Sequence, residues 1–174
     1  MAALRLLTIG HSYTVSANRR LARAIQQAGA GRWCVTVAAP TYFRGHNDIR
    51  PAELRVGPNE VCPVVPLRAY ATGFVHGFFY SAELRSLLAR GWDMVHAWEE
   101  PYILAGGQIA WGTPAPTRFV VRSAQSLPKC YPRPFAQIER GSSPPVARWT
   151  SLRPGRSALA KEQTMSFRAC SANT

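Results

Sequence analysis

Hydrophobic positions change their spacing repeatedly along the chain, and each change marks a predicted element. A continuous apolar run over residues 4–9 predicts a buried strand. From residue 16 to 28 the apolar positions recur at helical spacing, which predicts a helix that Ser16 caps and Gly29 ends in the left-handed conformation. A second apolar run over residues 33–39 predicts another strand. Together these segments predict a βαβ unit with parallel strands.

The same alternation continues further along the chain. Residues 41–60 are polar and contain several Gly and Pro, which predicts a loop. The remaining predicted strands are 61–67, 92–98 and 117–121, and the prolines of the first indicate an edge position. The remaining predicted helices are 81–90, 101 to about 111, and one that starts at 135. Alternating strands and helices are typical of α/β proteins, so we predict a Rossmann-like open, mostly parallel sheet as one domain over residues 1–140.

The segment 141–174 has a different character. It shows no sustained hydrophobic period and contains Ser-Ser-Pro-Pro and Arg-Pro-Gly-Arg. This composition predicts a disordered C-terminal tail, and a tail that binds phosphate groups is the functional alternative.

Charge narrows the choice of partners. The chain of 174 residues has 21 basic and 9 acidic residues, a formal charge of +12. The basic residues are scattered rather than clustered, which disfavours a nucleic-acid partner and leaves an anionic ligand or a peripheral contact with a membrane surface as alternatives. The apolar runs are too short to span a bilayer as a helix, so we expect a cytoplasmic protein, with membrane association as an alternative.

Motif spacing excludes several kinds of site. The four cysteines form no CxxC pair and no Cys/His set with zinc-like spacing, so we expect no metal. Neither GxGxxG nor the P-loop pattern is present, which disfavours dinucleotide and P-loop nucleotide sites. His96, within a predicted strand, is interpreted as a core residue. The aromatic segment 70–80 is interpreted either as core packing or as an exposed lip or membrane-surface patch.

Polar residues follow three of the predicted strands, and in an open parallel sheet these strand ends share one edge where ligands bind. The turn at Gly10 opens a helix that could hold a phosphate or simply make a tight turn. Glu99 or Glu100 could bind sugar hydroxyls, act as a base, or complement a helix N-terminus. The loop after the last predicted strand carries two cations and an amide: Arg122, Lys129 and Gln125. They could bind a sugar phosphate or a carboxylate, or they are solvated loop residues.

Several segments occur together in the order seen in one protein family. They are Leu-Leu-Thr-Ile-Gly-His-Ser-Tyr at 6–13, Trp-Asp-Met-Val-His-Ala-Trp-Glu-Glu-Pro at 92–101, Ser-Ala-Gln-Ser-Leu-Pro-Lys at 123–129 and Tyr-Pro-Arg-Pro-Phe at 131–135. Over about residues 4–140 the chain resembles the N-terminal, acceptor-side domain of a retaining GT-B glycosyltransferase of the group 1 family.

The resemblance implies one half of a GT-B fold and a function. Such enzymes transfer a sugar from a nucleotide-sugar to an acceptor with retention, usually without a bound metal or other cofactor. It implies that Gly10 lies near the donor phosphates and that His11 and Gln125 contact the transferred sugar or the acceptor. Gln125 stands where the family often has a histidine. It further implies that Glu99 or Glu100 binds acceptor hydroxyls and that Arg122 and Lys129 hold an anionic acceptor.

Length separates the chain from this family. Members are roughly twice as long, and the Glu-x7-Glu signature of their nucleotide-sugar domain is absent here. We therefore expect a truncated or frame-shifted glycosyltransferase with little or no transfer activity of its own. The alternatives are a stand-alone α/β module that binds an anionic ligand or a membrane surface, and a metal-free enzyme with a single Rossmann-like domain.

Overall fold

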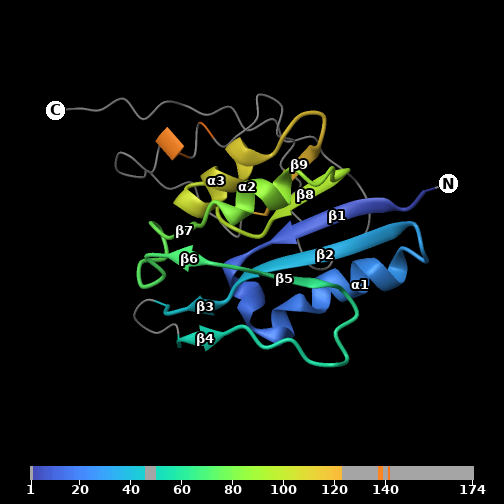
Figure 1. The fold of residues 1–174 in the computed structure, drawn as a ribbon, viewed down its shortest axis with the longest axis horizontal. Helices are drawn as coiled ribbons and strands as arrows, with labels where there is room; N and C mark the ends of the chain where they lie inside the picture. Colours follow the sequence, from blue (N-terminus) through green and yellow to red (C-terminus); the bar gives the residue numbers. More distant parts are fainter. Residues whose placement is uncertain (1, 46–49, 123–136, 139–140, 142–174) are drawn as a thin grey trace, which may run out of the picture.

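The computed structural model describes residues 2–45, 50–122, 137–138 and 141 (Figure 1). Its centre is a five-stranded sheet in the order β5-β2-β1-β8-β9, and every neighbouring pair is parallel. The strands are β1 (Leu4–Ile9), β2 (Trp33–Pro40), β5 (Val64–Leu67), β8 (Met94–Ala97) and β9 (Arg118–Val121). The predicted α/β class with a Rossmann-like, mostly parallel sheet is therefore confirmed. The prolines did mark an edge, since β5 is an outer strand.

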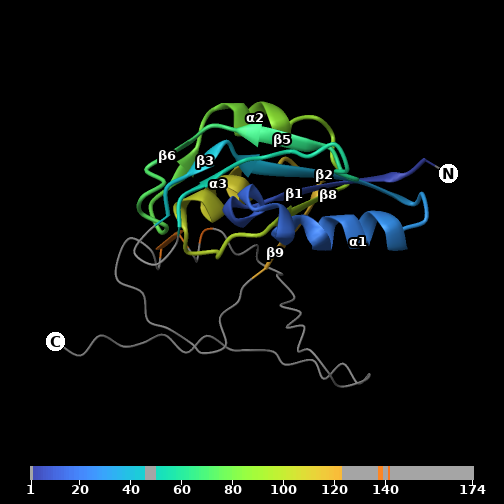
Figure 2. The same ribbon diagram turned by 90° about the horizontal axis from the view of Figure 1, so that it is seen from below.

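Both faces of the sheet are covered by helices (Figure 2). On one face, α1 (Arg20–Ala28) packs Ala22 and Ile25 with Leu6 of β1. On the other face, α2 (Glu83–Leu88) and α3 (Leu104–Gly112) contribute to a second cluster that contains Leu7 and Ile9 of β1. Alternate residues of β1 thus enter opposite cores, which is why its sequence is a continuous apolar run.

The first crossover departs from the predicted single helix. After β1 come two 3₁₀ turns, η1 (His11–Thr14) and η2 (Ser16–Arg19), and the α-helix starts only at residue 20. The predicted capping role of Ser16 is wrong, because Ser16 is the first residue of η2 and the N-cap position of α1 is occupied by Arg19. Gly29 is also not left-handed: its φ is −68°, and the positive φ angles fall on Ala30 and Gly31.

The reason for the delayed helix is the buried guanidinium of Arg19, whose side chain is 1% exposed. It donates to the backbone oxygens of Tyr13 and Arg55 at 2.6 and 2.8 Å and forms an ion pair with Glu60 at 2.8 Å. Because the backbone oxygen of Tyr13 faces this guanidinium, the chain before α1 turns back towards it instead of continuing as a regular helix. The acceptors at Arg55 and Glu60 come from the segment after β4.

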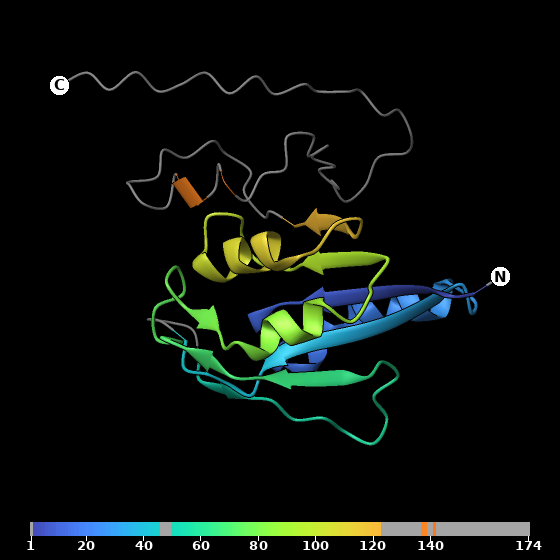
Figure 3. The same cartoon turned by 45° about the horizontal axis from the view of Figure 1, so that its top comes forward.

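Two short antiparallel pairs lie at the carboxyl edge of the sheet (Figure 3). One joins β3 (Tyr42–Phe43) to β4 (Ala52–Glu53), so the loop predicted over 41–60 contains strand pairing. The other joins β6 (Ala69–Tyr70) to β7 (Phe79–Tyr80). Each strand has only two residues, too few for a hydrophobic period to reveal it.

Within the described ranges, no helix has both the length and the apolar character needed to cross a membrane. The predicted disordered tail lies outside the described residues, apart from Gly141. Most of the helix predicted from residue 135 also lies outside them.

Candidate functional site

The site lies where the strand order reverses. From β1 the chain adds β2 and β5 on one side of the sheet and then β8 and β9 on the other. Gly10 and His11 follow β1, and Glu99 and Glu100 follow β8, its neighbour across the reversal. In open α/β sheets the carboxyl ends of the strands separate at such a reversal and leave a crevice in which ligands bind.

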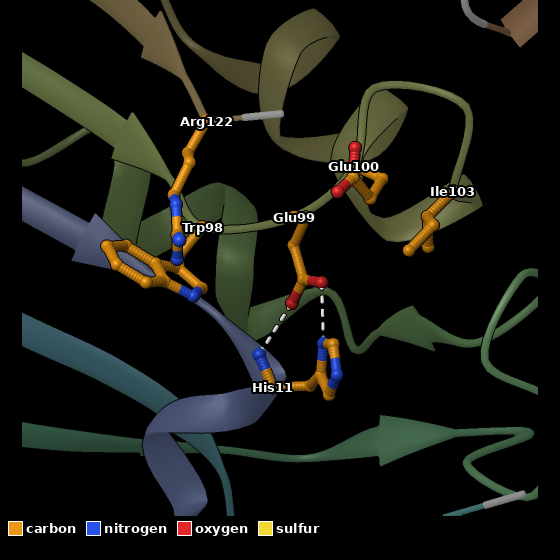
Figure 4. Close-up of a pocket in the computed structure, with 6 residues that line it drawn as sticks. All are labelled: His11, Trp98, Glu99, Glu100, Ile103 and Arg122. Carbon is orange, nitrogen blue, oxygen red and sulfur yellow. Dashed lines mark hydrogen bonds and ion pairs between the residues drawn. The ribbon is translucent and has the colours of Figure 1, made fainter. Parts of the chain in front are cut away.

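A buried carboxylate and a histidine join the two strand ends (Figure 4). Nδ1 of His11 lies 2.6 Å from Oε2 of Glu99, and the backbone N–H of His11 donates to Oε1 at 2.5 Å. The hydroxyl of Tyr80 also donates to Oε1, at 3.1 Å. The side chain of Glu99 is fully buried, so these three donors replace the water that would otherwise solvate its charge.

The carboxylate of Glu99 influences the protonation of His11. Burial lowers the pKa of this histidine, but the charge of Glu99 and the hydrogen bond to it outweigh burial, so the pKa is raised above 6.5. Hydrogen bonding to a carboxylate assigns a proton to Nδ1. Among the described residues Nε2 has no hydrogen-bond partner. The ring packs against Phe43 and Phe78, with centroid distances of 4.7 and 5.4 Å, which restrict its rotation.

Two glycines allow the backbone segments of the site to approach one another. A Cβ atom on Gly10 would lie 2.8 Å from Cβ of Trp98, the residue before Glu99. A Cβ atom on Gly106, in α3, would lie 2.5 Å from the backbone oxygen of Glu100. Both distances are too short for a side chain, so each position requires glycine to keep the β8 loop where it is.

A small cavity of about 120 Å³ opens beside the pair. His11, Trp98, Glu99, Glu100, Ile103 and Arg122 line it (Figure 4). The Arg122 guanidinium lies over the indole of Trp98, with Cζ 3.8 Å from the ring centroid, a cation–π arrangement. The cavity therefore offers an imidazole, a carboxylate and a guanidinium to a polar ligand, and an indole and an Ile side chain to its apolar parts.

A second layer of polar groups supports the cavity. The hydroxyl of Thr8 bonds to the Tyr13 hydroxyl at 2.8 Å and to Nδ1 of His96 at 2.9 Å. Burial, helped by the charge of Arg122, lowers the pKa of His96 to about 4. Burial also raises the pKa of Tyr13 to about 12. Both groups are therefore neutral near pH 7, and the rings of His96 and Tyr13 each contact that of Trp98, with centroid distances of 5.7 Å.

The structure brings some of the predicted site residues together. The fold brings Gly10, His11, Glu99, Glu100 and Arg122 to one edge. Gln125 and Lys129 lie outside the described residues. The two neighbouring glutamates separate into different environments, since Glu99 is buried against His11 whereas Glu100 is half-buried at the cavity. Within the part of the chain that the structure describes, no three His, Cys, Asp or Glu side chains form a group that could hold a metal ion.

Sequence reasoning missed several residues of the site. Tyr80 was seen only as a member of the aromatic segment 70–80 and Trp98 as a member of a predicted strand, whereas Phe43 fell in the predicted polar loop 41–60. Ile103 fell in a predicted helix. For Trp98 a signal existed, because it directly precedes Glu99 at a strand end. For Tyr80 and Phe43 there was none, since their approach to His11 depends on the two short strand pairs.

The chain was compared with protein-family models, with curated proteins and with solved structures, and none matches.

Proposed function

We propose that this domain is the acceptor side of a glycosyltransferase that moves a sugar from a nucleotide-sugar to an acceptor with retention. The observation that supports this best is the His11–Glu99 pair at the reversal of strand order, with Nε2 of His11 unpartnered among the described residues. In its neutral form, a histidine whose Nδ1–H is fixed by a buried carboxylate presents a lone pair of known direction at Nε2. Such an atom accepts a hydrogen bond from a hydroxyl group.

In this proposal His11 orients one hydroxyl of a sugar, and the cavity recognises the groups around it. Glu100 accepts hydrogen bonds from further hydroxyls, and Arg122 donates to a hydroxyl or to an anionic group of the acceptor. Trp98 and Ile103 contact the apolar ring faces. Glu99 does not touch the acceptor, because its oxygens are occupied by His11 and Tyr80.

The donor half of the reaction needs groups beyond these. Departure of a nucleoside diphosphate requires positive charge and N–H donors placed around its phosphates. At the described edge, Gly10 shapes the loop after β1, where its missing side chain makes room for Trp98. Arg122 is the one arginine or lysine of this edge that lines the cavity. The transfer rate of the chain alone is therefore expected to be low, with most phosphate contacts supplied by a second Rossmann-like domain.

The experiment is an NMR titration of the imidazole resonances. Methyl glycosides of glucose, galactose and mannose, and then UDP-glucose, are added to the labelled full chain. We expect a glycoside to shift the His11 resonances at millimolar concentrations, while those of His96, which does not line the cavity, shift less. The Glu99→Gln variant should bind that glycoside at least threefold more weakly.

The matched control is Arg32→Gln, an exposed arginine before β2 and so at the amino edge of the sheet. It should bind as the unsubstituted chain does. If no glycoside and no nucleotide-sugar shifts His11, the proposal is wrong. A response to inorganic phosphate alone, lost in Arg122→Gln, would support the stand-alone module that binds an anionic ligand.

A further inference from the structure

Four large aromatic side chains are exposed near the site, on the two short strand pairs and in the loop between β6 and β7. They are Tyr42, Tyr70, Phe74 and Phe79, with exposed fractions of 49, 44, 47 and 39%. Two exposed arginines, Arg44 and Arg68, lie in the same segments. We call these six residues the aromatic–arginine patch.

Backbone pairing brings most of the patch onto one face. Tyr70 and Phe79 are in register across β6 and β7, and their ring centroids are 5.4 Å apart. Residues 41–45 run beside 67–72, since the N–H of Thr41 donates to the oxygen of Leu67 and that of Gly45 to the oxygen of Thr72. The two segments therefore lie side by side (Figure 3).

Side-chain alternation separates the patch from the core. Phe43 and Tyr80 are buried, and Ala69 packs against the same core cluster. Their chain neighbours point the other way, because successive side chains of a strand face opposite sides. Tyr42 and Arg44 flank Phe43, and Tyr70 and Phe79 flank Ala69 and Tyr80. The outward aromatics are thus not needed to fill the core.

The chemistry of the patch fits a lipid headgroup layer better than water. Tyr carries an apolar ring with a polar tip, a combination enriched where bilayer meets water, and Phe inserts into the acyl boundary. Arginine near an anionic leaflet adds about 1 kcal/mol, or about fivefold in affinity, for each residue. Residues 61–82 contain no acidic residue, and the chain carries +12 overall. Two acidic residues lie at the margins of the patch. Glu53 is paired with Tyr42 across β3 and β4, and Glu83 accepts a hydrogen bond from the backbone N–H of Arg68.

We propose that the aromatic–arginine patch docks this protein onto a membrane surface that contains anionic lipid. The patch adjoins the candidate site, because Phe43, between Tyr42 and Arg44, packs its ring 4.7 Å from that of His11. A docked protein would hold its cavity near the headgroups, where a membrane-borne acceptor could reach it. The docking does not depend on the proposed transfer reaction, and its test contains no sugar.

The test is co-sedimentation of the full chain with vesicles of phosphatidylcholine alone and of phosphatidylcholine with phosphatidylglycerol. We expect binding to the mixed vesicles and at least tenfold weaker binding of Tyr70→Thr/Phe79→Thr, which keeps β-branched residues in both strands. Arg44→Gln should lose about fivefold on the mixed vesicles only, the effect of one arginine.

Matched controls lie at the opposite edge of the sheet. Leu4→Thr removes an apolar side chain that is also 44% exposed, and Arg32→Gln removes an exposed arginine. Both should bind vesicles as the unsubstituted chain does, and circular dichroism checks that every variant is folded. The proposal is overturned if the chain does not bind mixed vesicles or if the double variant binds equally well. It is also overturned if the double variant instead abolishes self-association measured by sedimentation velocity, because the patch would then join two copies of this chain.

Discussion

His11 and Glu99 are 88 residues apart in sequence, yet two hydrogen bonds of 2.5 and 2.6 Å join them. One bond uses the backbone N–H of His11 and the other its imidazole, so the carboxylate fixes both the loop after β1 and the ring that the loop carries. Neither strand end can shift alone without breaking a bond to a buried charge. The pair therefore controls the geometry of the site and the protonation of its one described histidine.

The Glu99→Gln variant tests this control directly. Without the negative charge, burial alone acts on His11, and its pKa should fall from above 6.5 to below it. We expect a loss of about 1–3 kcal/mol in the free energy of unfolding as well, because donors to the carboxylate lose part of their bonding. An NMR titration of the His11 ring measures the pKa, and urea unfolding measures the stability.

The pair should also appear in the pH dependence of stability. The pKa of His11 is raised in the folded state, so its stabilising contribution is complete below pH 6.5 and is lost as the pH rises through the raised value. Glu99→Gln should remove this decline. An unchanged decline in the variant would mean that another group causes it.

His96 should affect stability with the opposite sign. Its folded-state pKa is about 4, below the ordinary value of 6.5, because burial and Arg122 disfavour the charged ring. Between these values the unfolded chain binds more protons, so stability should decrease as the pH falls from 6.5 towards 4. His96→Asn should flatten this part of the profile, which thermal unfolding across the pH range can measure. A slope that persists in the variant would contradict the assignment.

Replacing the buried Arg19 should cost more stability than replacing any exposed arginine of the first crossover. Arg19→Met keeps a long side chain but leaves Glu60, only 9% exposed, without its closest cation, so we expect a loss of about 3–5 kcal/mol. The neighbour Arg20 is exposed, and Arg20→Met should change stability by less than about 0.5 kcal/mol. Adding Glu60→Gln to Arg19→Met should restore part of the loss, and a double-mutant cycle measures how much.

The close approach at Gly106 gives a prediction that runs against helix propensity. Ala is favoured over Gly in a helix by about 1 kcal/mol. At this position, however, its Cβ would lie 2.5 Å from the backbone oxygen of Glu100, so Gly106→Ala should destabilise by about 1–3 kcal/mol. Gly57→Ala is the control, since nothing lies within 4 Å of a Cβ there. Equal unfolding free energies for the two variants would contradict the steric argument.

Hydrophobic periodicity predicted the strands and helices whose buried positions repeat at regular intervals along the sequence. The five central strands appear in the sequence as apolar runs, and α1 and α2 as helical stripes, because each of them buries one or two faces in a core. The third helix was predicted from Pro101 instead, and α3 starts three residues later, at Leu104. The strand ends that carry Gly10, His11, Glu99 and Arg122 followed from this alternation and from the rule that ligands bind at carboxyl edges.

What sequence could not predict depends on contacts between distant segments. The start of α1 was misplaced because the guanidinium of Arg19 finds its acceptors at Arg55 and Glu60, in a segment that looked like plain loop. For the same reason, the sequence did not show which of Glu99 and Glu100 is buried. Only the approach of Tyr80 and the His11 backbone makes one of two adjacent carboxylates the buried one.

The indole of Trp98 limits the directions from which a ligand can reach the guanidinium of Arg122. Cζ of Arg122 lies 3.8 Å from the centroid of this ring, so a ligand cannot approach from the indole side. The N–H groups of a guanidinium point outward in its plane. A group that approaches edge-on meets several donors at once, whereas one that arrives from the indole side meets none. This corner of the cavity therefore selects ligands by their direction of approach to the guanidinium as well as by their charge.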